Sequence, residues 1–148
     1  MTHQKRSFIR RHSLSLAATA IIITLIFLYR SADASTHLGS FFGNAIADWS
    51  GVLVTVLATK FLYEKGSAES RRPPHRLLSP LLERFRDHSL TVFLLGTGAC
   101  WIALYLHMNS ESKWGQVVGN IVSEWTQVLG LVLMTKGLIE YHSKDSNR

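Results

Sequence analysis

The sequence predicts an all-α membrane protein with four transmembrane helices, arranged as two parallel tandem copies of a two-helix hairpin. Three observations predict this fold: four long apolar runs, basic residues confined to alternate loops, and an internal repeat with a spacing of 76 residues. The length of 148 residues allows one domain. Charged residues make up only 18% of the chain, which is below the roughly 25% typical of soluble domains.

The four apolar runs cover residues 14–29, 49–63, 90–108 and 121–139. A transmembrane helix needs about 20 apolar residues, and 17 to 25 are usual. The third and fourth runs reach this length by themselves. The first and second contain only about 15 or 16 residues, so they need flanking residues, such as 41–47, to span a bilayer.

Basic residues occur in the N-terminal arm, the central connector and the C-terminal end, but hardly at all in the other two loops. These three regions, with Lys60, hold 14 of the 16 Lys and Arg residues, namely Lys5, Arg6, Arg10, Arg11, Lys60, Lys65, Arg71, Arg72, Arg76, Arg84, Arg86, Lys136, Lys144 and Arg148. The other two loops contain only Arg30 and Lys113. Alternation of this kind is the positive-inside pattern. It predicts a multi-pass protein of the bacterial inner membrane with both termini cytoplasmic, rather than a nucleic-acid-binding protein.

The N-terminus also resembles a secretory signal, because a basic region and an apolar stretch precede Ala32-Asp33-Ala34, a possible cleavage site. The internal repeat argues against cleavage. The residues that recur 76 positions later include Arg10/Arg86, His12/His88, Tyr29/Tyr105, Gly39/Gly115, Gly43/Gly119, Asn44/Asn120, Trp49/Trp125, Thr59/Thr135, Lys60/Lys136, Glu64/Glu140 and Ser67/Ser143, with Asp48 opposite Glu124. The second copy has no use for a signal peptide, so we expect the first helix to be retained.

The repeat divides the chain into a first hairpin at residues 1–64, a linker at 65–85 and a second hairpin at 86–148. The linker contains Gly66, Pro73, Pro74 and Pro80, which do not suit a helix interior. Its last part, residues 81–87, is a short amphipathic segment. We expect this segment to lie at the membrane surface, where basic side chains bind anionic lipid headgroups.

Small residues recur every four positions at the start of the second span in each copy. The first copy has Gly39, Gly43, Ala47 and Gly51, which we call the glycine stripe, and the second has Gly115, Gly119, Ser123 and Gln127. Small residues at this spacing let helix backbones approach closely within a bilayer. The glycine stripe therefore predicts helix packing, including association of the chain into a homodimer.

An amide and a carboxylate accompany the small residues in each copy: Asn44 with Asp48, and Asn120 with Glu124. Residues four apart share a helix face, so these four side chains form a candidate site for a cation or for protons. The alternative is simple solvation, because Trp49 and Trp125 follow the two acids and tryptophan is common at the membrane–water interface.

At the other end of these spans, Lys60 and Lys136 recur as candidate interface anchors. Each lies four residues before a glutamate, Glu64 or Glu140, so each could form an ion pair along its helix.

The segment from Lys60 to Ser70, K-F-L-Y-E-K-G-S-A-E-S, resembles the end of the second helix in an uncharacterised family of bacterial proteins with four transmembrane helices. The match is specific over about 11 residues. Residues 49–65 are about one helical turn shorter than the family pattern, and the family's long extracytoplasmic loops are missing. The resemblance implies paired hairpins and no known activity.

The sequence contains no glycine-rich phosphate loop, no H-E-x-x-H, no nucleophile elbow and no potassium-channel filter. The single cysteine, Cys100, lies within the third apolar run and cannot form an intrachain disulfide. We therefore expect no enzyme activity, no cofactor and no metal. Two hypotheses remain: a self-associating structural or accessory protein of the membrane, or a minimal oligomeric ion channel or carrier, including an effector that depolarises the cell.

Overall fold

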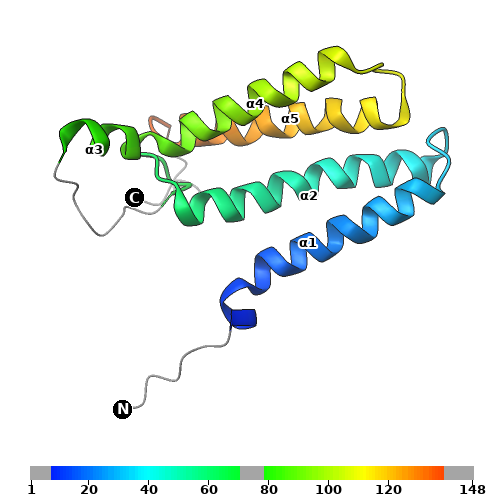
Figure 1. The fold of residues 1–148 in the computed structure, drawn as a ribbon, viewed down its shortest axis with the longest axis horizontal. Coiled ribbons are helices and arrows are strands. Elements are labelled where there is room, and N and C mark those ends of the chain that lie inside the picture. Colours follow the sequence, from blue (N-terminus) through cyan, green and yellow to red (C-terminus); the bar gives the residue numbers. More distant parts are fainter. Residues whose placement is uncertain (1–7, 71–78, 139–148) are drawn as a thin grey trace.

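The computed structural model describes residues 8–70 and 79–138, and these residues form helices joined by loops and turns (Figure 1). The five helices in the described ranges are α1 (Phe8–Ser31), α2 (His37–Phe61), α3 (Pro80–Asp87), α4 (Ser89–His107) and α5 (Lys113–Met134). All but α3 contain a stretch long and apolar enough to cross a membrane. The prediction of an all-helical chain with four such helices is confirmed.

Two helices begin well before the apolar runs that predicted them. α2 starts at His37 and α5 at Lys113, because Thr36 and Ser112 are N-caps whose hydroxyls accept the backbone N–H of Gly39 and Gly115. The polar residues that follow lie within regular helix, so hydropathy alone placed these starts too late. α2 also ends earlier than expected, at Phe61.

Both hairpins use the same turn, although its side chains differ between the copies. Asp33 and Asn109 each cap a turn by accepting a backbone N–H two residues later, at 2.9 Å. The backbone N–H and hydroxyl of Ser35, which both bond to the Asp33 carboxylate, lower its pKa. A Cβ at Gly39 or Gly115 would collide with the carbonyl of Asp33 or Asn109 respectively, so each turn requires glycine at that position.

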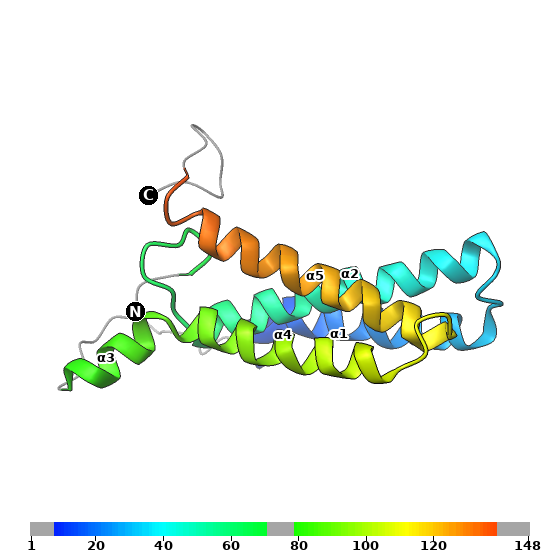
Figure 2. The same ribbon diagram turned by 90° about the horizontal axis from the view of Figure 1, so that it is seen from above.

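The central pair of the bundle is α2 and α5, with α1 packed on α2 and α4 packed on α5. Figures 1 and 2 show the turns at residues 32–36 and 108–112 at one end of the bundle, which we call the turn end. Residues 62–70 and α3 lie at the opposite end, which we call the linker end.

The core contains Tyr29, Leu90, Leu94 and Val132, which are almost completely buried. Many large apolar side chains point outward instead, and Phe27 and Leu106 are each 75% exposed. Soluble monomers rarely expose apolar surface on this scale, and large exposed apolar patches mark membrane or partner contacts.

Several residues used in the sequence argument lie outside the described ranges. These are Lys5, Arg6, Arg71, Arg72, Pro73, Pro74, Arg76, Glu140, Ser143, Lys144 and Arg148. Of the other basic residues, Arg30 and Lys113 lie at the turn end, where α1 ends and α5 begins, and the rest belong to the segments at the linker end.

Candidate functional site: the polar face of α2 and α5

The two predicted asparagines meet where α2 faces α5. The Nδ2 of Asn120 donates a hydrogen bond to the Oδ1 of Asn44 at 2.5 Å. These residues are 76 positions apart, which is the spacing of the sequence repeat. Equivalent positions of the two hairpins therefore touch each other directly.

An open pocket of about 250 Å³ lies on this face, which we call the polar pocket. Its lining consists of Asn44, Asp48, Asn120, Ser123 and Glu124. The structure thus brings together all four residues of the predicted ion or polar site, and Ser123 with them.

The two carboxylates of the polar pocket are held differently. Glu124 lies against Gly51 of α2, where an added Cβ would be 3.2 Å from its Oε2, and Gln127 Nε2 donates to its Oε1 at 3.3 Å. Asp48 is exposed and has no hydrogen-bond or ion-pair partner within residues 8–70 and 79–138. Gly51 therefore provides the space that Glu124 occupies.

The depth of the polar pocket differs from the sequence expectation. Asp48 and Glu124 lie near the middle of α2 and α5, which contain 25 and 22 residues. Helices of these lengths rise about 37 and 33 Å, so each acid is about 17 Å from either helix end.

Trp49 and Trp125 consequently lie at mid-helix, not at the helix ends where interface anchors occur. Trp125 is buried, its Nε1 donates to Thr97 Oγ1 at 2.8 Å, and its ring lies 5.8 Å from that of Trp101. The indole N–H thus has a partner inside the bundle and needs no water. Sequence analysis missed Thr97 and Trp101, because the first copy has Ile21 and Leu25 at these positions.

The glycine stripe packs within the chain. A Cβ at Gly43 would lie 3.1 Å from the ring of Tyr29, and one at Gly119 would lie 3.0 Å from Tyr105. Ala47 is completely buried, and Gly39, Gly51 and Gly115 are also buried. Close approach at these residues serves contacts inside one chain, so a dimer would have to use other surfaces.

The hairpins are joined at the turn end by an unpredicted contact. The hydroxyl of Tyr29 donates to the backbone carbonyl of Lys113 at 2.5 Å. The Lys113 ammonium donates to the carbonyl of Ala32 at 2.5 Å and lies 4.7 Å from the Tyr29 ring centre. Lys113 therefore has a structural role beyond its contribution to the charge pattern.

At the linker end, Glu64 is completely buried and joins the two hairpins. Its Oε1 lies 2.5 Å from Lys136 Nζ and 2.7 Å from His88 Nδ1, and its Oε2 accepts the backbone N–H of Thr91 at 3.0 Å. Burial raises the pKa of the Glu64 carboxyl, but the bonds from Lys136, His88 and Thr91 outweigh burial and lower that pKa to about 2. We call this group the Glu64 clamp.

The expected pairing of Lys60 with Glu64 along one helix is therefore wrong. α2 ends at Phe61, which takes Glu64 off the helix, and Lys60 Nζ lies 3.0 Å from His12 Nδ1 instead. The corresponding pair of Lys136 with Glu140 falls partly outside the described residues. The Glu64 clamp could not be recognised from spacing, because its members come from three separate segments.

Chemically, the polar pocket offers carboxylate, amide and hydroxyl oxygens, which are ligands for hard cations and acceptors for protons. Within the described ranges, no group of three or more His, Cys, Asp or Glu side chains is placed to hold a metal ion. Comparison of the chain with protein-family models, with curated proteins and with solved structures finds no match. The evidence for function therefore comes from the residues alone.

Proposed function

We propose that this chain is a four-span protein of the bacterial inner membrane that self-associates through the polar face of α2 and α5, as a structural or accessory component and not an enzyme. The observation that carries the proposal is the polar pocket at mid-helix. In a bilayer, that depth is the hydrocarbon centre, where an ionised Asp costs about 2.5–3.5 kcal/mol. A second copy covering the pocket would remove Asp48 and Glu124 from lipid.

We further propose that the two hairpins are tandem copies of one unit. Support comes from pairs of contacts that recur at a spacing of 76: Tyr29 on Gly43 and Tyr105 on Gly119, and the caps at Thr36 and Ser112. The Asn44–Asn120 hydrogen bond joins equivalent positions. A duplicated unit meeting its own copy commonly forms such a self-complementary contact.

The proposed orientation places the linker end and both termini in the cytoplasm. The described basic side chains support it, because Arg10, Lys60, Lys65, Arg84 and Lys136 belong to segments at the linker end. A reporter fused after Ala34 tests this orientation, since residue 34 belongs to the turn end. We expect an extracytoplasmic signal from a protein that keeps its N-terminus. Mature protein starting at Ser35 would contradict the retained first helix.

Disulfide crosslinking tests the self-association surface. Cys100 is exposed near the middle of α4, and Ser123 is exposed near the middle of α5 beside the polar pocket. We expect mild oxidation in membranes to give a covalent dimer for Ser123→Cys in a Cys100→Ser background. The wild-type chain, with its cysteine at a similar depth on α4, is the matched control and should stay monomeric. The reverse result would place the interface on α4.

A cation or proton pathway is the alternative function, and the two carboxylates in one pocket favour it specifically. Two polar pockets facing each other would enclose four carboxylates and four amides. In that case, reconstituted wild-type protein gives cation or proton flux into vesicles, and Asp48→Asn with Glu124→Gln abolishes the flux while insertion is unchanged. Absence of flux in the wild-type protein would leave self-association as the only function supported here.

A further inference from the structure

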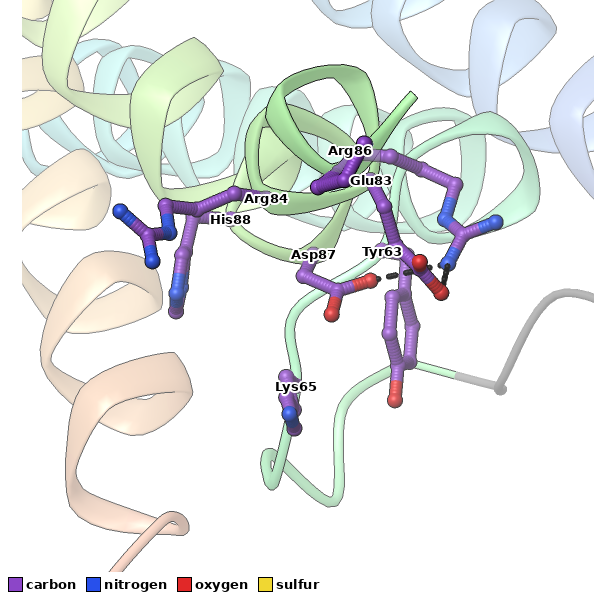
Figure 3. Close-up of a pocket in the computed structure, with 8 residues that line it drawn as sticks. Tyr63, Lys65, Glu83, Arg84, Arg86, Asp87 and His88 are labelled. Atoms are coloured by element: carbon purple, nitrogen blue, oxygen red, sulfur yellow. Dashed lines mark hydrogen bonds and ion pairs between the residues drawn. The ribbon is translucent and has the colours of Figure 1, made fainter. Parts of the chain in front are cut away.

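A second, larger pocket lies at the linker end, between α3 and the residues that follow α2. It has a volume of about 580 Å³, and we call it the α3 pocket. Its lining consists of Tyr63, Lys65, Pro80, Glu83, Arg84, Arg86, Asp87 and His88. Figure 3 shows Arg84 and His88 on one side, Tyr63 and Arg86 on the other, and Lys65 on the facing loop.

The charges of the α3 pocket do not cancel. Arg86 is bound by both carboxylates, Glu83 at 3.2 Å and Asp87 at 3.0 Å, as the dashed lines in Figure 3 show. Lys65 and Arg84 are exposed and have no ion-pair partner among the residues that the structure describes. Three basic side chains against two carboxylates leave one positive charge.

His88 does not change this balance. It is bonded to Glu64, whose negative charge is matched by Lys136 in the Glu64 clamp. The surplus charge therefore belongs to Lys65 and Arg84, which are also the two basic groups with free donors. An Arg guanidinium and a Lys ammonium are the usual ligands of a phosphate oxygen, and a surplus of one charge matches a phosphodiester, which carries a single negative charge.

The position of the α3 pocket selects among phosphate-bearing partners. Lys65 comes shortly after the end of α2 at Phe61, and Arg84 comes shortly before the start of α4 at Ser89. If α2 and α4 span the bilayer, this depth is the headgroup layer that borders the hydrocarbon core. α3 also exposes Leu81, Leu82 and Phe85 on its other face, an amphipathic arrangement typical of helices at the lipid interface.

We propose that the α3 pocket is a binding site for the headgroup of an anionic phospholipid, with the phosphodiester between Lys65 and Arg84. The inference rests on the proposed membrane placement, but it does not depend on self-association. It assigns a specific headgroup contact to this pocket, beyond the general attraction of basic segments to an anionic surface.

Native mass spectrometry of the full chain in neutral detergent tests this proposal, with added phosphatidylglycerol, phosphatidylcholine of the same acyl chains, or soluble glycerol 3-phosphate as probes. We expect one phosphatidylglycerol to bind each chain in preference to phosphatidylcholine. Each basic group near an anionic lipid changes affinity by about fivefold. Lys65→Ala with Arg84→Ala should therefore weaken phosphatidylglycerol binding by roughly 30-fold.

Two further variants make the test specific. Arg10→Ala with Arg30→Ala removes the same charge from exposed positions outside the pocket and should change the affinity less than twofold. Asp87→Asn removes a negative charge from the lining and should strengthen binding by about fivefold. Both variants keep the α2–α5 face intact, so lipid binding and crosslinking can fail separately.

Three results would overturn the proposal. The first is equal binding of phosphatidylglycerol and phosphatidylcholine by the wild-type chain. The second is an equal loss of affinity in the Lys65/Arg84 and Arg10/Arg30 variants, which would mean diffuse electrostatic attraction. The third is glycerol 3-phosphate displacing the lipid at equal concentration, which would identify the site as one for a free phosphate ester.

Discussion

Neutralising Glu64 should cost this protein a large share of its stability. The carboxyl has a pKa of about 2 in the folded chain against 4.5 for an ordinary glutamate. A difference of this size corresponds to about 3 kcal/mol of preference for the charged form. Glu64→Gln keeps the shape of the side chain but leaves Lys136 beside a neutral group. We therefore expect the free energy of unfolding to fall by about 3 kcal/mol, at the lower end of losses from broken buried ion pairs.

The same pKa predicts a pH dependence with a definite sign. Because the pKa is lower in the folded state, the stabilisation by Glu64 is fully present above pH 4.5 and is lost as the pH falls toward 2. Thermal unfolding followed by tryptophan fluorescence in neutral detergent should show this loss for the wild-type protein. The Glu64→Gln variant should lack this part of the pH profile.

Glu111→Gln is the matched control, because Glu111 is exposed and its side chain has no hydrogen-bond or ion-pair partner in the described part of the chain. Its effect on the free energy of unfolding should be within about 0.5 kcal/mol. Equilibrium unfolding in mixed micelles at pH 7 compares the three proteins. The reasoning about the Glu64 clamp is refuted if Glu64→Gln is no more destabilising than the control, or if both variants keep the wild-type pH profile.

Three other substitutions test the packing, each read by unfolding in mixed micelles. Gly39→Ala should destabilise the fold by about 1–3 kcal/mol because its Cβ meets a backbone carbonyl, whereas Gly96→Ala, which meets open space in α4, should be neutral or stabilising by up to about 1 kcal/mol; equal effects would contradict the turn geometry. Trp125→Phe should cost about 1–3 kcal/mol by leaving Thr97 without its donor, and an unchanged stability would count against that hydrogen bond. Tyr29→Phe should cost about 1 kcal/mol by removing the hydroxyl contact between the hairpins, so a stabilised variant would argue that the contact is absent.

The candidate site illustrates how far periodicity and spacing carry a prediction. Asn44, Asp48, Asn120 and Glu124 were selected because they recur at helical spacing, and the structure gathers them in one pocket. Their depth was misjudged because tryptophan was taken as a marker of the interface. Trp125 instead satisfies its N–H inside the bundle with Thr97, a partner 28 residues away in the sequence.

The role of the glycine stripe could not be predicted from spacing, because spacing does not say which helix approaches. Gly43 accommodates Tyr29 of the same hairpin, while Gly51 accommodates Glu124 of the other. The choice between these neighbours depends on how the hairpins dock.

By itself, the sequence determined the four long apolar helices, because hydropathy over about 20 residues is a local property that needs no knowledge of the packing. Only the tertiary structure decided the Glu64 clamp, the polar pocket and the α3 pocket. Each of these joins segments that are distant in the chain, and Glu64 alone meets partners 24 and 72 residues away. Contacts at such separations follow from the docking of α2 against α5, which no local pattern encodes.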